Sequence, residues 1–281
     1  MRRILLAILL VAAAGWAEEK PFFFTQLADP QFGMYTNSRG FEQETANFEF
    51  VVATINRIKP AFVIVCGDLV QTPGHQAEIA EYRRVAAKID HSIPVYNVAG
   101  NHDVGNEPTP ESLAAYRRRF GRDYYSFRQG GLAGFVLNSS ILHSPQHVPG
   151  ELEAQEVWLK AELEKASLAG VRHLVVFQHH SWFLNDPAEA DQYFNIPLER
   201  RRRYLELFRK FGVSHVFAGH YHRNALGRDG PLEMVTTGPV GKPLGKDGSG
   251  LRVVFVRDSA IEHRYYELGF LPHRIEVEQK K

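Results

Sequence analysis

The chain has 281 residues, of which 44% are hydrophobic and 23% charged, with 23 glycines, 15 prolines and one cysteine. This balance is that of an ordinary globular protein and excludes a disordered, collagen-like or coiled-coil chain. With 33 Lys and Arg against 32 Asp and Glu, the formal charge of +1 provides no strong field for nucleic acid or a membrane surface. The single cysteine, Cys66, cannot form an internal disulfide and lies in an apolar run typical of a buried thiol.

The N-terminal segment has the features of an export signal. Two arginines precede an apolar stretch, and the small residues Gly15 and Ala17 stand where a signal peptidase requires them. The apolar stretch is shorter than the ~20 residues that a membrane-spanning helix needs. We therefore expect residues 1–17 to be a signal peptide and residues 18–281 to be the mature domain. The protein is then exported, either periplasmic or secreted, with no membrane span after cleavage.

After this segment, short apolar runs alternate with segments of helical period, which is typical of a layered α/β domain. The pattern predicts strands over 21–28, 61–66, 94–99, 135–138, 173–178 and 214–218. It predicts helices over 44–58, 75–90, 109–120, 153–168 and 199–210. In the tail, 232–236, 251–257 and 261–267 form successive strands without helices between them, which indicates a second sheet with antiparallel pairs. We expect one domain.

Two stretches are irregular. Residues 181–197 are rich in Pro, Asn and aromatic side chains and are too long for a routine connection, so they are either functional or an insertion. Residues 238–250 are rich in glycine, which permits a close approach of the backbone to another group and is equally typical of a surface loop.

Five of the predicted strands end in polar residues. Because the carboxyl ends of strands in layered α/β folds face one crevice, these side chains are expected to meet. Carboxylates, an amide and imidazoles without a thiolate suit Mn, Fe or Zn, and there are enough ligands for two ions bridged by one carboxylate. The clusters are Asp29 with Gln31, Asp68, Asn101 with His102 and Asp103, His179 with His180, and His220 with His222.

Each cluster taken singly also has an ordinary structural explanation. A Gly-Asp pair after a strand is usually a turn or a helix cap, as Asp68 would be. Two histidines one residue apart, such as His220 and His222, suit a ligand pair but also occur in surface loops. Five such clusters in this order, each after a strand, favour the metal site.

The motifs resemble the signature of the calcineurin-like metallophosphoesterases over residues 29 to 222. They are Gly67-Asp68, Gly100-Asn101-His102-Asp103, His179 and Gly219-His220-Tyr221-His222. The resemblance implies a four-layer αββα sandwich of two mixed sheets flanked by helices, with a dinuclear metal centre. It makes Asp68 the bridging carboxylate, assigns Asp29 and His222 to one ion, and assigns Asn101, His179 and His220 to the other. His102 would lie near the scissile phosphate.

The first motif departs from the family pattern. The family usually has Asp-x-His, whereas this chain has Asp29-Pro30-Gln31, so a neutral amide carbonyl replaces an imidazole as a ligand. That ion is therefore expected to bind loosely, to differ in identity or to be lost. The same string, with Tyr193-Phe-Asn-Ile-Pro197, resembles a subgroup described as protein serine/threonine phosphatases, the calcineurin-like phosphoesterase domain-containing protein 1 type. On that resemblance Gln31 is a subgroup trait.

Hydrolysis of a phosphate ester needs charge neutralisation, an activated water and a proton for the leaving oxygen. Two cations supply the first two needs, so attack by a metal-bound hydroxide is expected. His102 is the candidate for the third, as general acid or as a contact to the phosphoryl group, and such help is worth ~10² to 10⁴ in rate. Asp103 has two equally weighted roles, which are orienting His102 and capping the local turn.

Substrate contacts are less determined by the sequence. Arg223 follows the histidine pair and is a candidate phosphate contact, and Asn195 with its aromatic neighbours Tyr193 and Phe194 is a candidate wall of the site, with loop packing as the alternative. The run of arginines at 200–203 is interpreted as a solvated helix face, because it continues into an amphipathic helix.

We therefore expect a metal-dependent hydrolase of phosphomonoesters, acting on phosphoserine and phosphothreonine or on a small phosphomonoester, with no stable nucleic acid partner. One alternative is a phosphodiesterase acting on cyclic nucleotides, nucleic acid or lipid head groups, although Gln31 counts against the cyclic-nucleotide enzymes. The other is a non-catalytic module that binds metal and phosphate.

Overall fold

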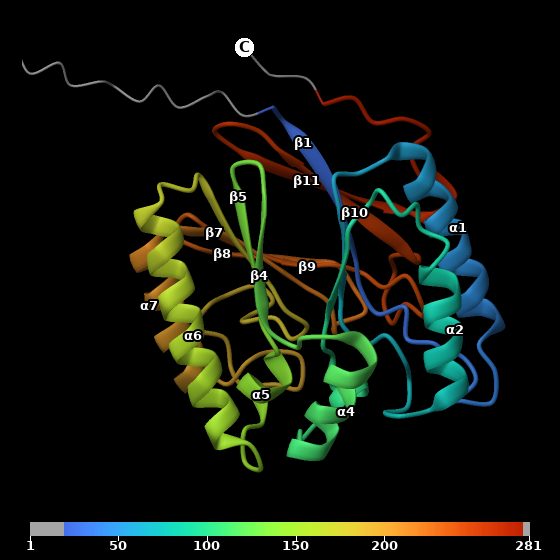
Figure 1. Ribbon diagram of the computed structural model, residues 1–281, viewed down its shortest axis with the longest axis horizontal. Helices are drawn as coiled ribbons and strands as arrows, with labels where there is room; N and C mark the ends of the chain where they lie inside the picture. The colour runs from blue at the N-terminus through green and yellow to red at the C-terminus, as the bar shows by residue number, and fades with distance from the viewer. Residues whose placement is uncertain (1–19, 278–281) are drawn as a thin grey trace, which may run out of the picture.

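The computed structural model describes residues 20–277, and Figure 1 shows its elements. The strands are β1 (Phe22–Leu27), β2 (Val63–Cys66), β3 (Val95–Val98), β4 (Tyr125–Gln129), β5 (Leu132–Val136), β6 (His173–Phe177), β7 (Val213–Ala218), β8 (Ala225–Asp229), β9 (Leu232–Thr236), β10 (Gly250–Val256) and β11 (Ile261–Glu267). The helices are α1 (Glu42–Ile58), α2 (Gln76–Ala86), α3 (Asn101–Val104), α4 (Pro110–Phe120), α5 (Ser139–His143), α6 (Pro149–Leu168) and α7 (Leu198–Phe211), followed by a 3₁₀ turn, η1 (Leu268–Phe270). The predicted signal peptide lies outside the described residues.

The strands form two sheets, one of five strands in the order β11-β10-β1-β2-β3 and one of six in the order β4-β5-β6-β7-β9-β8. In the five-stranded sheet β1, β2 and β3 are parallel, and β10 and β11 extend it antiparallel. In the six-stranded sheet β5, β6, β7 and β9 are parallel, and the edge strands β4 and β8 are antiparallel to their neighbours. The expected pair of mixed sheets is confirmed.

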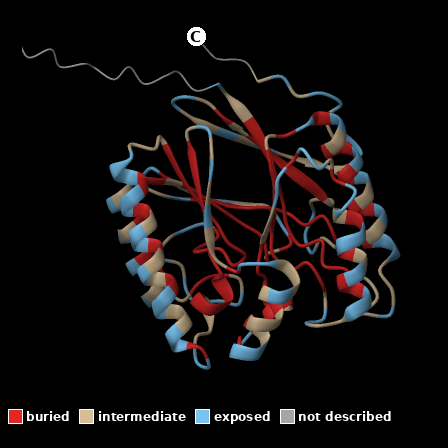
Figure 2. Cartoon of the chain, viewed as in Figure 1, coloured by how far each residue is buried: buried red, intermediate tan, exposed pale blue. Residues whose placement is uncertain are grey.

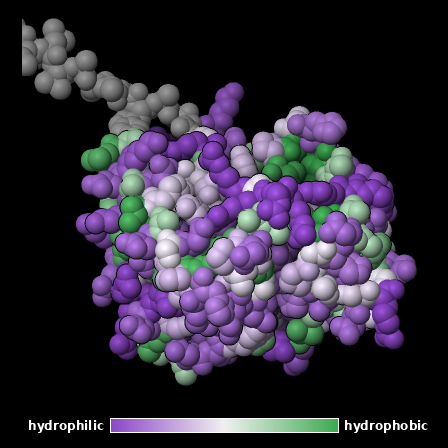
Figure 3. Space-filling view, turned by 60° about the horizontal axis from the view of Figure 1, so that its bottom comes forward, coloured by the Kyte–Doolittle hydropathy of each residue, from purple (hydrophilic) through white to green (hydrophobic). Residues whose placement is uncertain are grey.

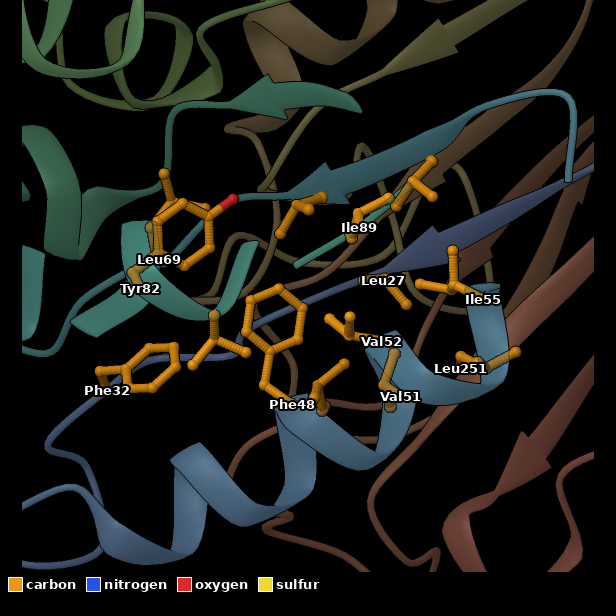
Figure 4. Packing of buried hydrophobic residues seen from close by; sticks show 14 of the residues in the cluster. Leu27, Phe32, Phe48, Val51, Val52, Ile55, Leu69, Tyr82, Ile89 and Leu251 are labelled. Atoms are coloured by element: carbon orange, nitrogen blue, oxygen red, sulfur yellow. The ribbon is translucent and has the colours of Figure 1, made fainter. Parts of the chain in front are cut away.

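Three hydrophobic clusters hold the layers together. One packs α1 and α2 against the five-stranded sheet around Phe48 and Tyr82 (Figure 4). Another packs α6 and α7 against the six-stranded sheet. The third lies between the sheets, where the ring of Phe24 is 5.7 Å from that of Phe177 and 5.8 Å from that of Phe217. Figure 2 shows the result: the central strands are buried, the edge strands are partly exposed, and the outer faces of the helices are exposed. The four-layer αββα arrangement follows.

The prediction that the three tail strands form a sheet of their own was wrong. The strand at 232–236 is β9, which pairs with β7 in the six-stranded sheet, whereas β10 and β11 join the other sheet beside β1. The glycine-rich connection 238–250 crosses between the sheets. Hydrophobic alternation identifies a strand but carries no information about which sheet receives it.

Two edge strands and two short helices were not predicted. Alternate residues are exposed in both β4 and β8, so neither presents an apolar run. Helices α3 and α5 have four and five residues, which is too short for a period to be detected. No helix within residues 20–277 is long and apolar enough to cross a membrane.

Candidate metal centre

The predicted ligands gather where strands of the two sheets end. Strands β1, β2 and β3 deliver residues from the five-stranded sheet, and β6 and β7 deliver residues from the six-stranded sheet. In Figure 1, β1 starts at the upper edge and runs downward, so these carboxyl ends lie in the lower half of the view. All seven predicted metal ligands are at least 96% buried, and they are Asp29, Gln31, Asp68, Asn101, His179, His220 and His222.

Asp68 is common to two groups of ligand atoms. In one group Asp68, His179 and His220 offer atoms that lie within 4.8 Å of one another, and in the other Asp29, Asp68 and His222 do so. Asn101 belongs beside the first group, because its Oδ1 is 3.0 Å from His179 Nε2. The His222 Nε2 is 3.4 Å from Asp29 Oδ1 in the second. The arrangement offers two candidate cation sites that share one carboxylate.

Backbone carbonyls select the tautomer of each imidazole. The Nδ1 of His179 donates to the Cys66 carbonyl at 2.8 Å, and the Nδ1 of His222 donates to the Lys242 carbonyl at 2.6 Å. The Nε2 of His220 donates to the Tyr193 carbonyl at 3.0 Å. Because one ring nitrogen of each histidine is used in this way, the other is available to a cation.

The ligands stand in unusual backbone conformations. Five of the seven have φ in the left-handed region, namely Asp29 (48°), Gln31 (37°), Asp68 (50°), His220 (67°) and His222 (53°). Such conformations cost about 1–3 kcal/mol each in a residue with a Cβ and concentrate at functional sites. The backbone is therefore locally strained at the residues whose side chains meet in the centre.

The motif glycines are required because ligands pack against them. A Cβ on Gly67 would lie 2.3 Å from His179 Nδ1, and one on Gly100 would lie 2.1 Å from Asp68 Oδ1. The glycine-rich connection 238–250 has the same use, since a Cβ on Gly241 would meet the Asp29 carbonyl at 2.7 Å. The glycines of this connection thus allow its backbone to pack closely against the segment that carries Asp29.

The donor set fits divalent or trivalent cations. Gln31 uses its Nε2 to donate to Gln71 Oε1 at 3.0 Å, whereas its carbonyl Oε1 is buried without a hydrogen-bond partner among the described residues. An unpaired buried carbonyl is costly, and a cation would satisfy it. Carboxylate, amide and imidazole donors without a thiolate match manganese, iron or zinc.

Proximity of these groups changes their protonation in the metal-free protein. Burial opposes a charge on His179, but Asp68, whose Oδ2 is 3.2 Å from His179 Nε2, raises its pKa to about 9. Burial likewise opposes a charge on Asp68, but His179 and His102 hold its pKa well below the usual range. Burial, with the charge of Asp68, raises the pKa of Asp103 to about 8. The centre thus contains an ion pair that a cation would replace.

His102 lies beside the shared carboxylate. Its backbone N–H donates to Asp68 Oδ1 at 2.9 Å, and its Nδ1 donates to the Gln71 carbonyl at 2.6 Å. The half-buried ring leaves Nε2 without a hydrogen bond to any described residue. This nitrogen is therefore able to meet a substrate.

Of the two roles predicted for Asp103, the structure shows the cap. Its Oδ2 accepts from the Gly100 N–H at 2.8 Å and its Oδ1 accepts from the Leu69 N–H at 3.0 Å. The prediction that it orients His102 was wrong, because the His102 imidazole donates to Gln71 instead. Asp103 fixes the turn that carries Asn101 and His102.

Both residues predicted as substrate contacts make hydrogen bonds within the protein. Asn195 is buried and donates to Glu189 Oε1 at 2.8 Å and to the Ala190 carbonyl at 3.0 Å, so it folds the loop from within. The exposed Arg223 donates to the Leu244 carbonyl at 2.9 Å and lies over the ring of Tyr221 at 5.0 Å. Asn195 thus holds the loop together, whereas the contact of Arg223 with phosphate stays a prediction.

Two residues of the centre were missed or undervalued by sequence reasoning. Gln71 contacts both Gln31 and His102, and its only signal was its place in the segment after Asp68. Tyr193 accepts from Asn101 Nδ2 at 3.1 Å through its hydroxyl, and its ring is 4.7 Å from that of His220. Tyr193 therefore contacts two predicted metal ligands in addition to packing within its loop.

Figure 3 turns the lower side of the molecule toward the reader. Hydrophilic residues cover most of this face, and hydrophobic ones appear in small separate patches.

Comparison with known proteins agrees with the geometry. A family model described as calcineurin-like phosphoesterase matches residues 24–224. The chain is 41% identical over 269 residues to the bovine (Bos taurus) serine/threonine-protein phosphatase CPPED1, covering 90% of this chain and 86% of that protein. It is 39% identical over 270 residues to the human protein of the same name, with the same coverage.

A solved structure agrees at the level of the fold. A dimetal phosphatase from Danio rerio superposes with a TM-score of 0.62 at 18% identity, covering 88% of this chain and 99% of that one. The chain belongs to the calcineurin-like phosphoesterase family and is a metal-dependent hydrolase of phosphoric esters.

Proposed function

We propose that this enzyme hydrolyses phosphomonoesters and that phosphorylated serine and threonine side chains are its substrate class. The observation that carries the proposal is Asp68, shared by two groups of cation ligands with His102 beside it. The substrate class rests on the relatives, which are named serine/threonine-protein phosphatases and align with 90% of this chain.

Two bound cations would neutralise the phosphoryl oxygens and lower the pKa of a coordinated water. One would be held by Asp29, Asp68, His222 and the Gln31 carbonyl, and the other by Asp68, Asn101, His179 and His220. We propose manganese, iron or zinc, because the donors are nitrogen and oxygen only.

The remaining chemistry falls to His102. Its Nδ1–H is held by the Gln71 carbonyl, so a proton on Nε2 would face the substrate. In the balanced reaction water gives one proton to solvent and adds to phosphorus as hydroxide, the P–O bond to the alcohol breaks, the leaving oxygen takes the Nε2 proton, and solvent then restores that proton to His102. The Asp68 carboxylate accepts a hydrogen bond from the backbone N–H of His102. This contact would keep the imidazole ring beside the reacting phosphoryl group.

The proposal is tested by comparing three substrates, namely a phosphoserine peptide, p-nitrophenyl phosphate and bis(p-nitrophenyl) phosphate, with metal-loaded protein. We expect the two monoesters to turn over faster than the diester, and His102→Ala to lower kcat by ~10² to 10⁴. His91→Ala is the matched control, since His91 is exposed and makes no hydrogen bond to a described residue.

Other outcomes point to the alternatives. Preference for the bis-ester would contradict the monoesterase and favour a phosphodiesterase. No turnover of any ester, with metal and phosphate still bound, would favour a binding module.

We also propose that the protein is exported, either to the periplasm or out of the cell. The support is the arginine, apolar and small-residue order of residues 1–17. N-terminal sequencing of the protein from each cell fraction tests this, and we expect Glu18 as the first residue outside the cytoplasm. An intact Met1 confined to the cytoplasmic fraction would contradict it.

A further inference from the structure

Loop 181–197 is the irregular stretch whose purpose the sequence left open. Its ends pack into the apolar cluster of the six-stranded sheet through Trp182, Phe183 and Ile196, and charged side chains organise the segment between them. The Glu189 carboxylate accepts from the backbone N–H groups of Leu184 and Asn185 at 2.8 and 3.1 Å. The buried Arg201 guanidinium, from α7, donates to the carbonyls of Ile196 and Glu189 at 2.9 and 2.7 Å. These hydrogen bonds give the loop a defined conformation.

The held loop presents Tyr193 to two ligands of one cation site. The Tyr193 carbonyl accepts from His220 Nε2 at 3.0 Å, which leaves His220 Nδ1 for a cation. The Tyr193 hydroxyl accepts from Asn101 Nδ2 at 3.1 Å, which turns the Asn101 Oδ1 toward His179 Nε2, 3.0 Å away. A single loop residue thus orients ligands that come from β3 and β7, in different sheets.

The other cation site has no such contact with the loop. His222 is oriented by the Lys242 carbonyl, and Gln31 by Gln71. The Asp29 carboxylate accepts from the His220 N–H at 3.0 Å. These partners lie in segments other than 181–197. A substitution of Tyr193 should therefore change the metal affinity of one site more than that of the other.

From this asymmetry we propose that Tyr193 is a positioning residue for the cation held by Asn101, His179 and His220, and that loop 181–197 thereby controls the affinity of that site alone. The inference rests on the proposed function only in taking the two ligand groups as metal sites. Hydrogen bonds from behind a ligand fix its orientation, and their loss typically lowers metal affinity by about 10- to 100-fold.

The loss for a single variant should lie near the lower end of that range. The second N–H of Asn101 Nδ2 donates to Asn106 Oδ1 at 2.8 Å, so Asn106 still holds the amide when the Tyr193 hydroxyl is removed. We expect about a 10-fold loss in Tyr193→Phe and a larger one when Asn106→Ala is added.

The experiment is a calorimetric titration of the metal-stripped full chain with Mn²⁺ alone. In Tyr193→Phe one binding step should weaken by about 10-fold. The other should keep its wild-type affinity, and it should be the step that Gln31→Ala weakens. Tyr221→Phe makes the same chemical change on a neighbouring ring, whose hydroxyl accepts from Arg223 and from no other residue within 20–277, and it should alter neither step.

Two results would overturn the inference. One is an unchanged affinity for every Mn²⁺ that binds, and the other is equal weakening of both steps. Thermal unfolding of the metal-free variant checks its fold, which should be unaffected because Tyr193 is 50% exposed. Two normal binding steps without hydrolysis of a phosphomonoester would contradict the proposed function and leave this inference intact.

Discussion

The Gln31 side chain has a carbonyl oxygen that is available to bind a cation. Its Oε1 is buried without a hydrogen-bond partner among the described residues, although its Nε2 is held by Gln71. An amide carbonyl binds a cation less strongly than an imidazole but still contributes a ligand. We therefore propose that Gln31 is a ligand of the metal centre rather than part of the apolar core.

We predict that Gln31→Ala lowers the affinity for one cation by about 10-fold while the fold is retained. The lost carbonyl leaves that cation with Asp29, Asp68 and His222. Calorimetric titration with Mn²⁺ measures the change. Gln43→Ala is the control, because Gln43 is exposed and its side chain donates a hydrogen bond to Asn47, away from the predicted ligands. Affinities equal to the wild type in Gln31→Ala would show that Oε1 is not a ligand.

The protonation of His179 predicts a pH dependence of metal binding. In the metal-free protein its pKa is raised to about 9, so it is charged at pH 7 and must lose the Nε2 proton to bind a cation. The apparent affinity should therefore rise with pH by up to about tenfold per unit and level off near pH 9. Titrations in buffers of different ionisation enthalpy measure the proton released. No release at pH 7 would contradict this assignment.

At the scale of elements, the arginine run at 200–203 was interpreted as a solvated face, and this was wrong for one member. Arg201 is fully buried and donates to the carbonyls of Pro187, Glu189 and Ile196, whereas Arg202 is exposed. Helical periodicity identified α7, but a long polar side chain that turns inward to satisfy a loop leaves no periodic signal.

We predict that Arg201→Met destabilises the protein by about 3 kcal/mol, because the buried Ile196 carbonyl and the part-buried carbonyls of Pro187 and Glu189 lose this donor. Urea unfolding measures the free energy. The matched variant Arg202→Met should change it by less than about 0.5 kcal/mol. If the two variants unfold alike, Arg201 does not hold the loop.

At the scale of the whole molecule, the layers do not depend on metal. Separate apolar clusters hold the helices on the sheets and the sheets on each other. Cations that bind only the native state add stability, amounting to about 2.7 kcal/mol for one site at 100 times its Kd. Removing the metal should lower Tm by several degrees without unfolding the protein at 25 °C, as calorimetry would show. An unfolded metal-free chain would contradict the independence of the layers.

The sequence predicted the central strands and the ligands because both depend on local signals. Buried parallel strands are apolar runs, and each ligand such as Asp68 or His179 follows one of them directly. What it could not predict arises from contacts between distant segments. The sheet that β10 joins, the inward turn of Arg201 and the contact of Tyr193 with Asn101 are each set by packing that no short window contains.

The central claim is that two cations sharing Asp68 carry out phosphomonoester hydrolysis. The most direct test adds Mn²⁺ stepwise to metal-stripped protein while bound metal and turnover of p-nitrophenyl phosphate are measured together. Activity should appear as the second equivalent binds, and Asp68→Asn should abolish both that binding and the turnover while remaining folded. Full activity with one equivalent, or in the metal-free protein, would contradict the account.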